Sequence, residues 1–241
     1  MKAQIPNAIT SANLICGCLA LMQIAEGNLV NASIFVLLGA FFDFFDGMAA
    51  RLLKVKSEIG AQLDSLADLV TFGVAPSFIA FKLIERQTDE PSLAYLALLL
   101  AVFSALRLAK FNVDDRQTEQ FIGLPTPSNA LFWVSIPLIN WQAESLTSLV
   151  AVDGIVAIFQ DDFFLVAAVL TLSYALVAEV PLLSLKFKNL AWKENKSRFT
   201  LLGIALLLIA LFYFVAIPII LLLYLLISII ENRKATDEIQ S

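Results

Sequence analysis

Long apolar runs recur along this chain, separated by short polar segments, and no other feature constrains the fold as strongly. A helix that spans a bilayer needs about 20 mostly apolar residues. The chain is 59% hydrophobic and 15% charged, whereas soluble domains are about 25% charged. The sequence therefore predicts an all-α polytopic membrane protein with about eight transmembrane helices. The predicted spans cover residues 8–25, 30–53, 61–84, 92–111, 128–143, 162–185, 199–214 and 216–232.

The last apolar run, FTLLGIALLLIALFYFVAIPIILLLYLLISII, is too long for one ordinary span, and Pro218 interrupts it. It is therefore either a hairpin of two helices or one kinked helix. Charge favours the hairpin, because with eight spans all of the 16 lysines and arginines except Lys82 and Arg86 fall on one side. Seven spans would move Arg233 and Lys234 to the other side. Since basic residues concentrate on the cytoplasmic side, we expect both termini in the cytoplasm and the protein in the cytoplasmic (inner) membrane.

The rarest residue types limit the chemistry that this chain can perform. It has no histidine, which excludes Ser-His-Asp catalysis and His-ligated zinc. Its two cysteines, Cys16 and Cys18, lie in an apolar run and point in different directions on a helix, so we interpret them as core residues. No soluble domain or internal repeat is evident. We therefore expect a single membrane domain over residues 1–241, with no nucleic-acid partner.

Four aspartates gather in the stretch DFFDGMAARLLKVKSEIGAQLDSLAD, residues 43–68, at the predicted cytoplasmic ends of two spans. Asp43 and Asp46 share one helical face, and Asp64 and Asp68 share a face of the next helix. One aspartate at the centre of a membrane costs roughly 2.5–3.5 kcal/mol, and four would also repel one another. Bound divalent cations offset this cost, and carboxylate oxygens suit Mg²⁺, Mn²⁺ or Ca²⁺. Four carboxylates could hold two metal ions, an arrangement that clamps diphosphates during displacement at phosphorus.

Small and basic residues accompany these aspartates. Gly47, Ala50 and Gly60 would let a ligand approach the backbone closely, and Arg51 could pair with a phosphate. One alternative is that the aspartates cap helices or pair with basic residues at the interface. An ion transporter is another, although its carboxylates would be spread over several spans near the midplane. An intramembrane prenyltransferase would also use aspartate clusters, but on helices far apart in the sequence.

Residues 43–68 match the pattern D-x2-D-G-x2-A-R-x8-G-x3-D-x3-D at every position, and this pattern resembles the signature of the CDP-alcohol phosphotransferase family. The resemblance implies a six-helix core, here at about residues 5–190, followed by a C-terminal hairpin at 199–232. It implies an enzyme that moves a phosphoryl-bearing group from a CDP-activated lipid or alcohol to an acceptor hydroxyl and releases CMP. It also implies a metal cofactor, two ions of Mg²⁺ or Mn²⁺, and a homodimer.

The same resemblance implies a role for most positions of the signature. Asp68 would act as the catalytic base on the acceptor hydroxyl. The metal ligands would be Asp43, Asp46, Asp64 and Asp68. The CDP pocket would be lined by Asp46, Gly47, Ala50, Arg51, Gly60 and Asp64.

Three further stretches resemble the phosphatidylserine synthase branch of this family, namely PNAITSANLICG, SALRLAKFN and FIGLPTPSNA. This branch implies CDP-diacylglycerol as the donor and L-serine as the acceptor, within membrane lipid. The carboxylate of serine needs cations, but glycerol 3-phosphate and inositol phosphate attract cations too and stay open as acceptors. The expected serine-binding residues are Arg107, Lys110, Asn112 and Thr126, and the expected N-terminal pocket residues are Asn7, Thr10 and Asn13.

One acidic residue near the predicted end of the sixth span has two interpretations. Glu179 could take part in function, as intramembrane carboxylates commonly do. It could equally pair with Lys186, about two helical turns later in the chain.

Overall fold

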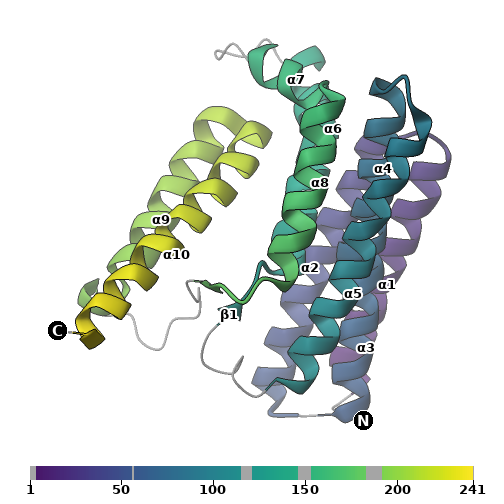
Figure 1. The fold of residues 1–241 in the computed structure, drawn as a ribbon. Coiled ribbons are helices and arrows are strands. Elements are labelled where there is room, and N and C mark those ends of the chain that lie inside the picture. Colours follow the sequence, from purple (N-terminus) through teal and green to yellow (C-terminus); the bar gives the residue numbers. More distant parts are fainter. Residues whose placement is uncertain (1–3, 56, 115–120, 146–152, 183–191, 241) are drawn as a thin grey trace.

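The computed structural model describes residues 4–55, 57–114, 121–145, 153–182 and 192–240, and these form an antiparallel bundle of helices (Figure 1). The described part contains eight long helical rods, which confirms the predicted all-α fold. The rods are α1 (Gln4–Ala25), α2 (Leu29–Leu53), α3 (Glu58–Asp68) continued by the π-helix η1 (Leu69–Val74) and α4 (Ala75–Gln87), the 3-10 helix η2 (Pro91–Ala97) continued by α5 (Leu98–Val113), α6 (Thr126–Ser145), α8 (Asp162–Val177), α9 (Trp192–Phe212) and α10 (Ala216–Gln240).

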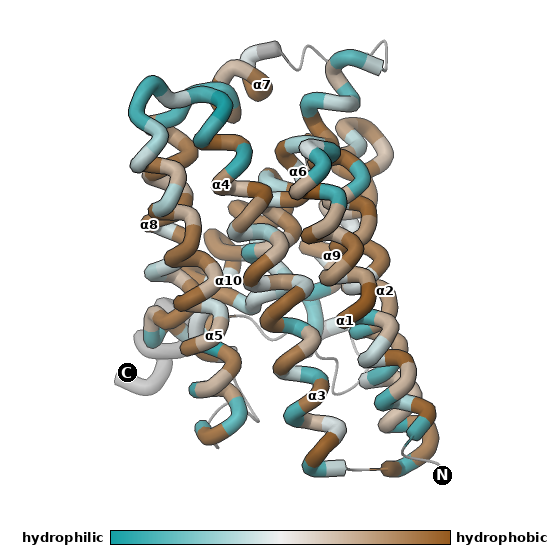
Figure 2. The backbone as a smooth tube through the Cα atoms, turned by 90° about the vertical axis from the view of Figure 1, so that its right-hand side faces the viewer, coloured by the Kyte–Doolittle hydropathy of each residue, from teal (hydrophilic) through white to brown (hydrophobic). Residues whose placement is uncertain are grey.

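Five helical stretches of the described chain are long and apolar enough to cross a membrane. Hydrophobic residues cover most of the length of these helices (Figure 2). The stretches are Gln4–Ala25, Leu29–Leu53, Glu58–Gln87, Pro91–Val113 and Arg198–Glu231, and the apolar helix Asp162–Val177 is shorter. The protein is therefore an integral membrane protein, and its two ends lie at the same end of the bundle (Figure 1).

The predicted sixth span, 162–185, was wrong after residue 177, where the described residues 178–182 are not helical, and residues 183–185 lie outside the described part of the chain. Helix α8 ends at Val177, because Ala178 adopts an extended backbone with ψ 135°. Pro181 and Leu182 then form the short strand β2, which pairs antiparallel with β1 (Phe121–Ile122). Glu179 therefore follows the helix rather than ending it, and its suggested partner Lys186 lies outside the described residues.

The C-terminal apolar run is a hairpin, as the charge pattern predicts. Helix α9 ends at Phe212, and Tyr213 takes a positive φ of 51° at the start of the short 3-10 turn η4 (Tyr213–Val215). Helices α9 and α10 then run side by side in opposite directions (Figure 1). Gln142 of α6 holds this turn, because its side chain donates to Phe212 O at 3.2 Å and accepts from Phe214 N at 3.0 Å.

Helix starts follow local capping rules near the aspartates. The side chain of Ser57 accepts a hydrogen bond from Gly60 N at 3.1 Å and starts α3. Helix α2 ends where Lys54 enters the left-handed region with φ 52° and its N–H bonds back to the carbonyls of Ala50 and Arg51. The connection between the two aspartate-bearing helices is therefore short, with Val55 as its last described residue before Ser57.

The rod that carries Asp64 and Asp68 changes to a π-helix directly after Asp68. Thr71 in this π-turn is fully buried, and its hydroxyl donates to Asn13 O at 3.1 Å. A Cβ at Gly17 or at Gly39 would lie 2.5 Å from the Thr71 side chain. These two glycines therefore let α1 and α2 pack directly against the π-turn, and π-bulges of this kind are frequent at functional sites.

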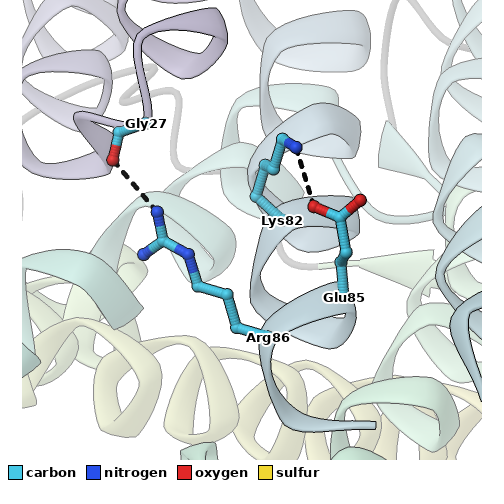
Figure 3. Close-up of polar contacts among 4 residues, drawn as sticks. All are labelled: Gly27, Lys82, Glu85 and Arg86. Atoms are coloured by element: carbon cyan, nitrogen blue, oxygen red, sulfur yellow. Dashed lines mark hydrogen bonds and ion pairs between the residues drawn. The ribbon is translucent and has the colours of Figure 1, made fainter. Parts of the chain in front are cut away.

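At the end of the bundle away from the termini, side chains of α4 hold the turn between α1 and α2 (Figure 3). Arg86 Nη2 donates to Gly27 O at 3.0 Å, and Gly27 has a φ of 80° that favours glycine. Lys82 and Glu85 form an exposed ion pair at 2.7 Å on the same helix. Exposed ion pairs contribute little to stability, and this pair lies within one helix, whereas the Arg86 hydrogen bond connects α4 to the α1–α2 turn.

Candidate active site

Three of the four aspartates predicted as metal ligands lie together. Oxygen atoms of Asp43, Asp64 and Asp68 all lie within 4.8 Å of one another, and each of these side chains is half-buried. Asp64 Oδ1 is buried without a hydrogen-bond partner among the described residues. A hard divalent cation takes oxygen ligands, so this unpaired oxygen and the clustered carboxylates fit such an ion.

Asp46 stands slightly apart from these three carboxylates. It is the most buried of the four aspartates, and Thr10 Oγ1 donates to its Oδ2 at 2.6 Å. It still interacts electrostatically with Asp43, Asp64 and Asp68. The structure thus brings the four carboxylates into one site, with Asp46 held by α1 on one side of it.

Two of the three residues predicted for an N-terminal pocket lie on α1 and form hydrogen bonds to the aspartates. Thr10 bonds to Asp46, and Asn13 Nδ2 donates to Asp68 Oδ1 at 3.1 Å. Asn13 is fully buried, and its Oδ1 has no hydrogen-bond partner among the described residues. These contacts hold the carboxylates of Asp46 and Asp68 in place beside α1.

A cavity of about 610 Å³ lies on the α1–α2 side of the aspartates, and we call it the motif cavity. Its walls carry small residues of the signature, because Gly47, Ala50 and Gly60 all line it. A Cβ at Gly47 would meet nothing within 4 Å, so this glycine leaves open space, whereas one at Gly60 would meet Asn7 Oδ1 at 2.9 Å. Asp46, Asp64, Asn7 and Thr10 also line the motif cavity, whereas Arg51 is exposed and does not.

A second cavity of about 690 Å³ lies on the opposite side of the aspartates, between the core and α9–α10, and we call it the hairpin cavity. Asp64 and Asp68 line it from the third rod, and Arg107 and Asn112 line it from α5. Thr126 lines it at the start of α6. Three of the four predicted serine-binding residues therefore surround one space that also contains Asp68.

Lys110, the fourth of these residues, lies elsewhere. It lines a smaller cavity of about 160 Å³ together with Glu179, and Arg107 lines both this cavity and the hairpin cavity. Lys110 and Glu179 are thus brought to one place, although neither lines the hairpin cavity. The short stretch from Ala178 to Leu182 that carries Glu179 is held by Gly123, whose N–H donates to Val180 O at 2.9 Å.

The sequence analysis missed Tyr224, which lines the hairpin cavity from α10 and is only 7% exposed. The only signal in the sequence is one tyrosine inside an apolar run, and tyrosines are common near membrane interfaces. Nothing local in the sequence places this residue opposite Arg107, more than one hundred positions earlier in the chain.

Chemically, the site joins two spaces through one set of carboxylates. Asp64 and Ala61 line both the motif cavity and the hairpin cavity. Carboxylates that hold a divalent cation can neutralise a diphosphate and orient it for displacement at phosphorus. A group in one cavity and a group in the other would thus meet at Asp64.

Comparison with known proteins supports the family resemblance of residues 43–68. A family model described as CDP-alcohol phosphatidyltransferase matches residues 3–160. Three proteins named CDP-diacylglycerol–serine O-phosphatidyltransferase are similar to the chain. The Bacillus subtilis protein is 46% identical over 124 residues, which cover 51% of this chain and 69% of the relative. The Helicobacter pylori protein is 34% identical over 137 residues (56% and 57%), and the Methanocaldococcus jannaschii protein is 37% identical over 138 residues (56% and 62%).

The family model covers the signature and the described helices from α1 to α6, and it ends well before the C-terminal hairpin begins. The part matched by the family model contains all four aspartates, the small residues Gly47, Ala50 and Gly60 that line the motif cavity, and Arg107. Since the family model spans well over half of the sequence, the chain belongs to the CDP-alcohol phosphatidyltransferase family.

Proposed function

We propose that this protein transfers the phosphatidyl group of CDP-diacylglycerol to the hydroxyl of L-serine, which gives phosphatidylserine and CMP. The observation that carries the proposal is that the aspartate cluster separates two cavities of different character. The motif cavity is lined by small residues of the signature, and the hairpin cavity contains the buried cation Arg107. The names of the three relatives, each a CDP-diacylglycerol–serine O-phosphatidyltransferase, support the same donor and acceptor.

The motif cavity is the proposed site of the CDP group. The open space beside Gly47 would admit the nucleotide close to α2, and Asp46 and Asp64 line this cavity at its inner end. Two divalent ions, Mg²⁺ or Mn²⁺, held by Asp43, Asp46, Asp64 and Asp68, would supply neutralisation of the diphosphate and of the departing phosphate.

Asp68 is the proposed base. It lines the hairpin cavity, and the hydrogen bond that Asn13 donates to its Oδ1 orients the carboxylate there. In the proposed step the serine oxygen forms a bond to the phosphorus that carries diacylglycerol, and its proton passes to Asp68. The bond from this phosphorus to the bridging oxygen breaks, and CMP leaves.

Arg107 is the proposed partner of the serine carboxylate. It is 5% exposed, and its Nε has no hydrogen-bond partner among the described residues. A buried guanidinium with an unpaired donor binds a carboxylate well. Asn112 is held near the site by Ser65, to whose Oγ its Nδ2 donates at 2.9 Å. Glycerol 3-phosphate and inositol phosphate remain the alternative acceptors within the family.

The setting of the enzyme is also part of the proposal. Both termini and the aspartate cluster would face the cytoplasm, in the cytoplasmic membrane, because basic residues favour that side. The acyl chains of the donor would stay in the lipid. The active form would be a homodimer, as the family resemblance implies, and chemical cross-linking in membranes checks this directly.

The function is tested by CMP release from the purified protein in detergent. CDP-diacylglycerol is presented with Mn²⁺ or Mg²⁺ and with serine, glycerol 3-phosphate or inositol phosphate in turn. We expect release that requires serine and metal, is abolished by excess EDTA and is lost in Asp68→Asn. The matched control is Asp89→Asn, which changes an exposed aspartate in the loop at the far end of the bundle.

Two results would contradict the proposal in different ways. Release with another acceptor but not with serine would keep the family and discard the acceptor. If folded protein, shown by cooperative thermal unfolding, releases no CMP with any of these acceptors, the proposed transfer is wrong. Ion transport would then be the alternative function to test.

A further inference from the structure

The C-terminal hairpin forms one wall of the cavity that contains the proposed base. Leu201, Ala205 and Ile209 of α9 and Ile217, Ile220, Leu221 and Tyr224 of α10 line the hairpin cavity opposite Asp68. The family match ends at residue 160, so this wall lies outside the part of the chain that the match covers. The acceptor side of the site is therefore completed by an element whose contribution the family match does not describe.

Tyr224 is the polar member of this wall. The other six hairpin residues that line the cavity are aliphatic. The Tyr224 side chain is 7% exposed and interacts with Ser228, one turn further along α10, which is itself fully buried. A phenol hydroxyl is costly to bury in an apolar wall unless it has a polar partner, and the hydrogen bond to Ser228 keeps this hydroxyl at the wall of the cavity.

Arg107 is a second polar group beside this phenol, because Arg107 and Tyr224 line the same cavity from α5 and α10. Both side chains are buried at this cavity, 5% exposed for Arg107 and 7% for Tyr224, and the guanidinium and the phenol interact electrostatically there. Arg107 comes from α5 and is also packed against the ring of Phe111, whose centroid lies 5.9 Å from Arg107 Cζ. Its unpaired Nε shows that the buried guanidinium has donor capacity left for a ligand.

We infer that Tyr224 is a positioning residue for the acceptor: its hydroxyl holds the Arg107 guanidinium so that it binds the carboxylate of an α-amino acid in the hairpin cavity. This inference rests on the proposed function and deepens it, because it names the group that sets acceptor specificity and the helix that brings it. An acceptor without a free carboxylate would gain nothing from the Tyr224–Arg107 pair.

The test compares Tyr224→Phe, which removes only the hydroxyl, with the unmodified enzyme. Loss of a hydrogen bond to a charged group changes an affinity by about tenfold or more, so we expect the KM for serine to rise by about that factor. The kcat and the KM for CDP-diacylglycerol stay within about twofold, because the base and the motif cavity are untouched. Tyr213→Phe is the matched control, since Tyr213 lies at the hairpin turn and is 56% exposed.

A second acceptor and a second variant separate this role from simple packing. L-serine methyl ester keeps the hydroxyl and the amine but has no carboxylate, so its KM should be equal in the unmodified enzyme and in Tyr224→Phe. An unchanged KM for serine in Tyr224→Phe, with losses only in Tyr224→Leu, would show that the ring packs and the hydroxyl does nothing, which overturns the inference. An unmodified enzyme that releases CMP only with another acceptor would overturn the proposed function, and the inference with it.

Discussion

At the scale of single residues, the site depends on where side chains are missing as much as on where they are present. Gly47 and Gly39 lie on the same helix, eight residues apart, and have opposite surroundings. A Cβ at Gly47 would extend into open space at the motif cavity, whereas a Cβ at Gly39 would lie 2.5 Å from Thr71 Cγ2 and 2.9 Å from Asn13 Oδ1. One glycine therefore leaves room for a ligand, and the other leaves room for the protein itself.

This contrast predicts two different defects from the same substitution. Gly47→Ala should fold normally and raise the KM for CDP-diacylglycerol several-fold, because the added methyl group occupies ligand space and alanine favours the helix. Gly39→Ala should lower the free energy of unfolding by about 1–3 kcal/mol through overpacking and should also lower kcat, because it displaces Asn13 from Asp68.

Steady-state kinetics and thermal unfolding of the two variants measure these effects. Gly203→Ala is the control, because Gly203 is an exposed glycine on α9 with no atom near its added Cβ. A Gly47→Ala enzyme with unchanged kinetics would show that no ligand group occupies the space beside α2.

At the scale of elements, the hairpin is tied to the six-helix part of the bundle at two levels. Tyr224 lines the hairpin cavity together with Arg107 and Asp68, and Gln142 of α6 bonds to both sides of the hairpin turn at the far end. Gln142 is 1% exposed, and its two hydrogen bonds to the turn are partly buried. The hairpin therefore contacts the rest of the bundle at its turn, through Gln142, as well as beside the hairpin cavity.

Gln142→Leu should detach this tip while preserving the size of the side chain. Two backbone groups would lose a buried partner, which costs about 1–3 kcal/mol for each group. We expect thermal unfolding at a temperature several degrees lower, and faster hydrogen exchange of the amides from Tyr213 to Val215. Gln23→Leu is the control, because Gln23 bonds only to exposed partners, Glu26 and Asn31. Equal exchange in both variants would contradict the role of Gln142.

At the scale of the whole molecule, the alternating rods put the chain ends and the aspartate-bearing connection at one end, and the loop after α4 at the other (Figure 1). In a protein whose own Cys16 and Cys18 are replaced by alanine, single cysteines at Lys54 and Asp89 report these two ends. Both positions are exposed. With the proposed orientation, a membrane-impermeant maleimide added to intact cells should label Asp89→Cys and not Lys54→Cys. The reverse pattern would place the site outside.

Much of this architecture could be predicted from the sequence, because the informative contacts are local. Helix spacing puts Asp64 and Asp68 on one face, and a short connection brings them to Asp43 and Asp46, so the carboxylate cluster needs no long-range information. The hairpin could be predicted because two helices in the last apolar run, rather than one, place Arg233 and Lys234 on the same side of the membrane as most other lysines and arginines. The end of α8 was placed too late, since hydropathy continues past the point at which Ala178 leaves helical geometry.

The parts that could not be predicted depend on contacts between distant segments. Gln142 bonds to residues about 70 positions later, and Tyr224 and Arg107 line one cavity from α10 and α5. Neither pairing produces a pattern that can be recognised in a short stretch of sequence. The π-turn after Asp68 also has no local signature, because it arises where Gly17 and Gly39 let two neighbouring helices press against Thr71. Such contacts can be identified only once the helices are packed together.

The hairpin wall of the site has a consequence for how the rate of this enzyme should be expressed. Ile209 lines the cavity and is 48% exposed on a helix whose outer face, with Leu206 and Leu207, is open to lipid. The proposed lipid donor and lipid product would therefore exchange with a two-dimensional solvent, while the proposed nucleotide product would exchange with water. Saturation should follow the mole fraction of the donor within the bilayer or micelle rather than its bulk molarity, so adding detergent at constant donor would slow the reaction as an inhibitor would.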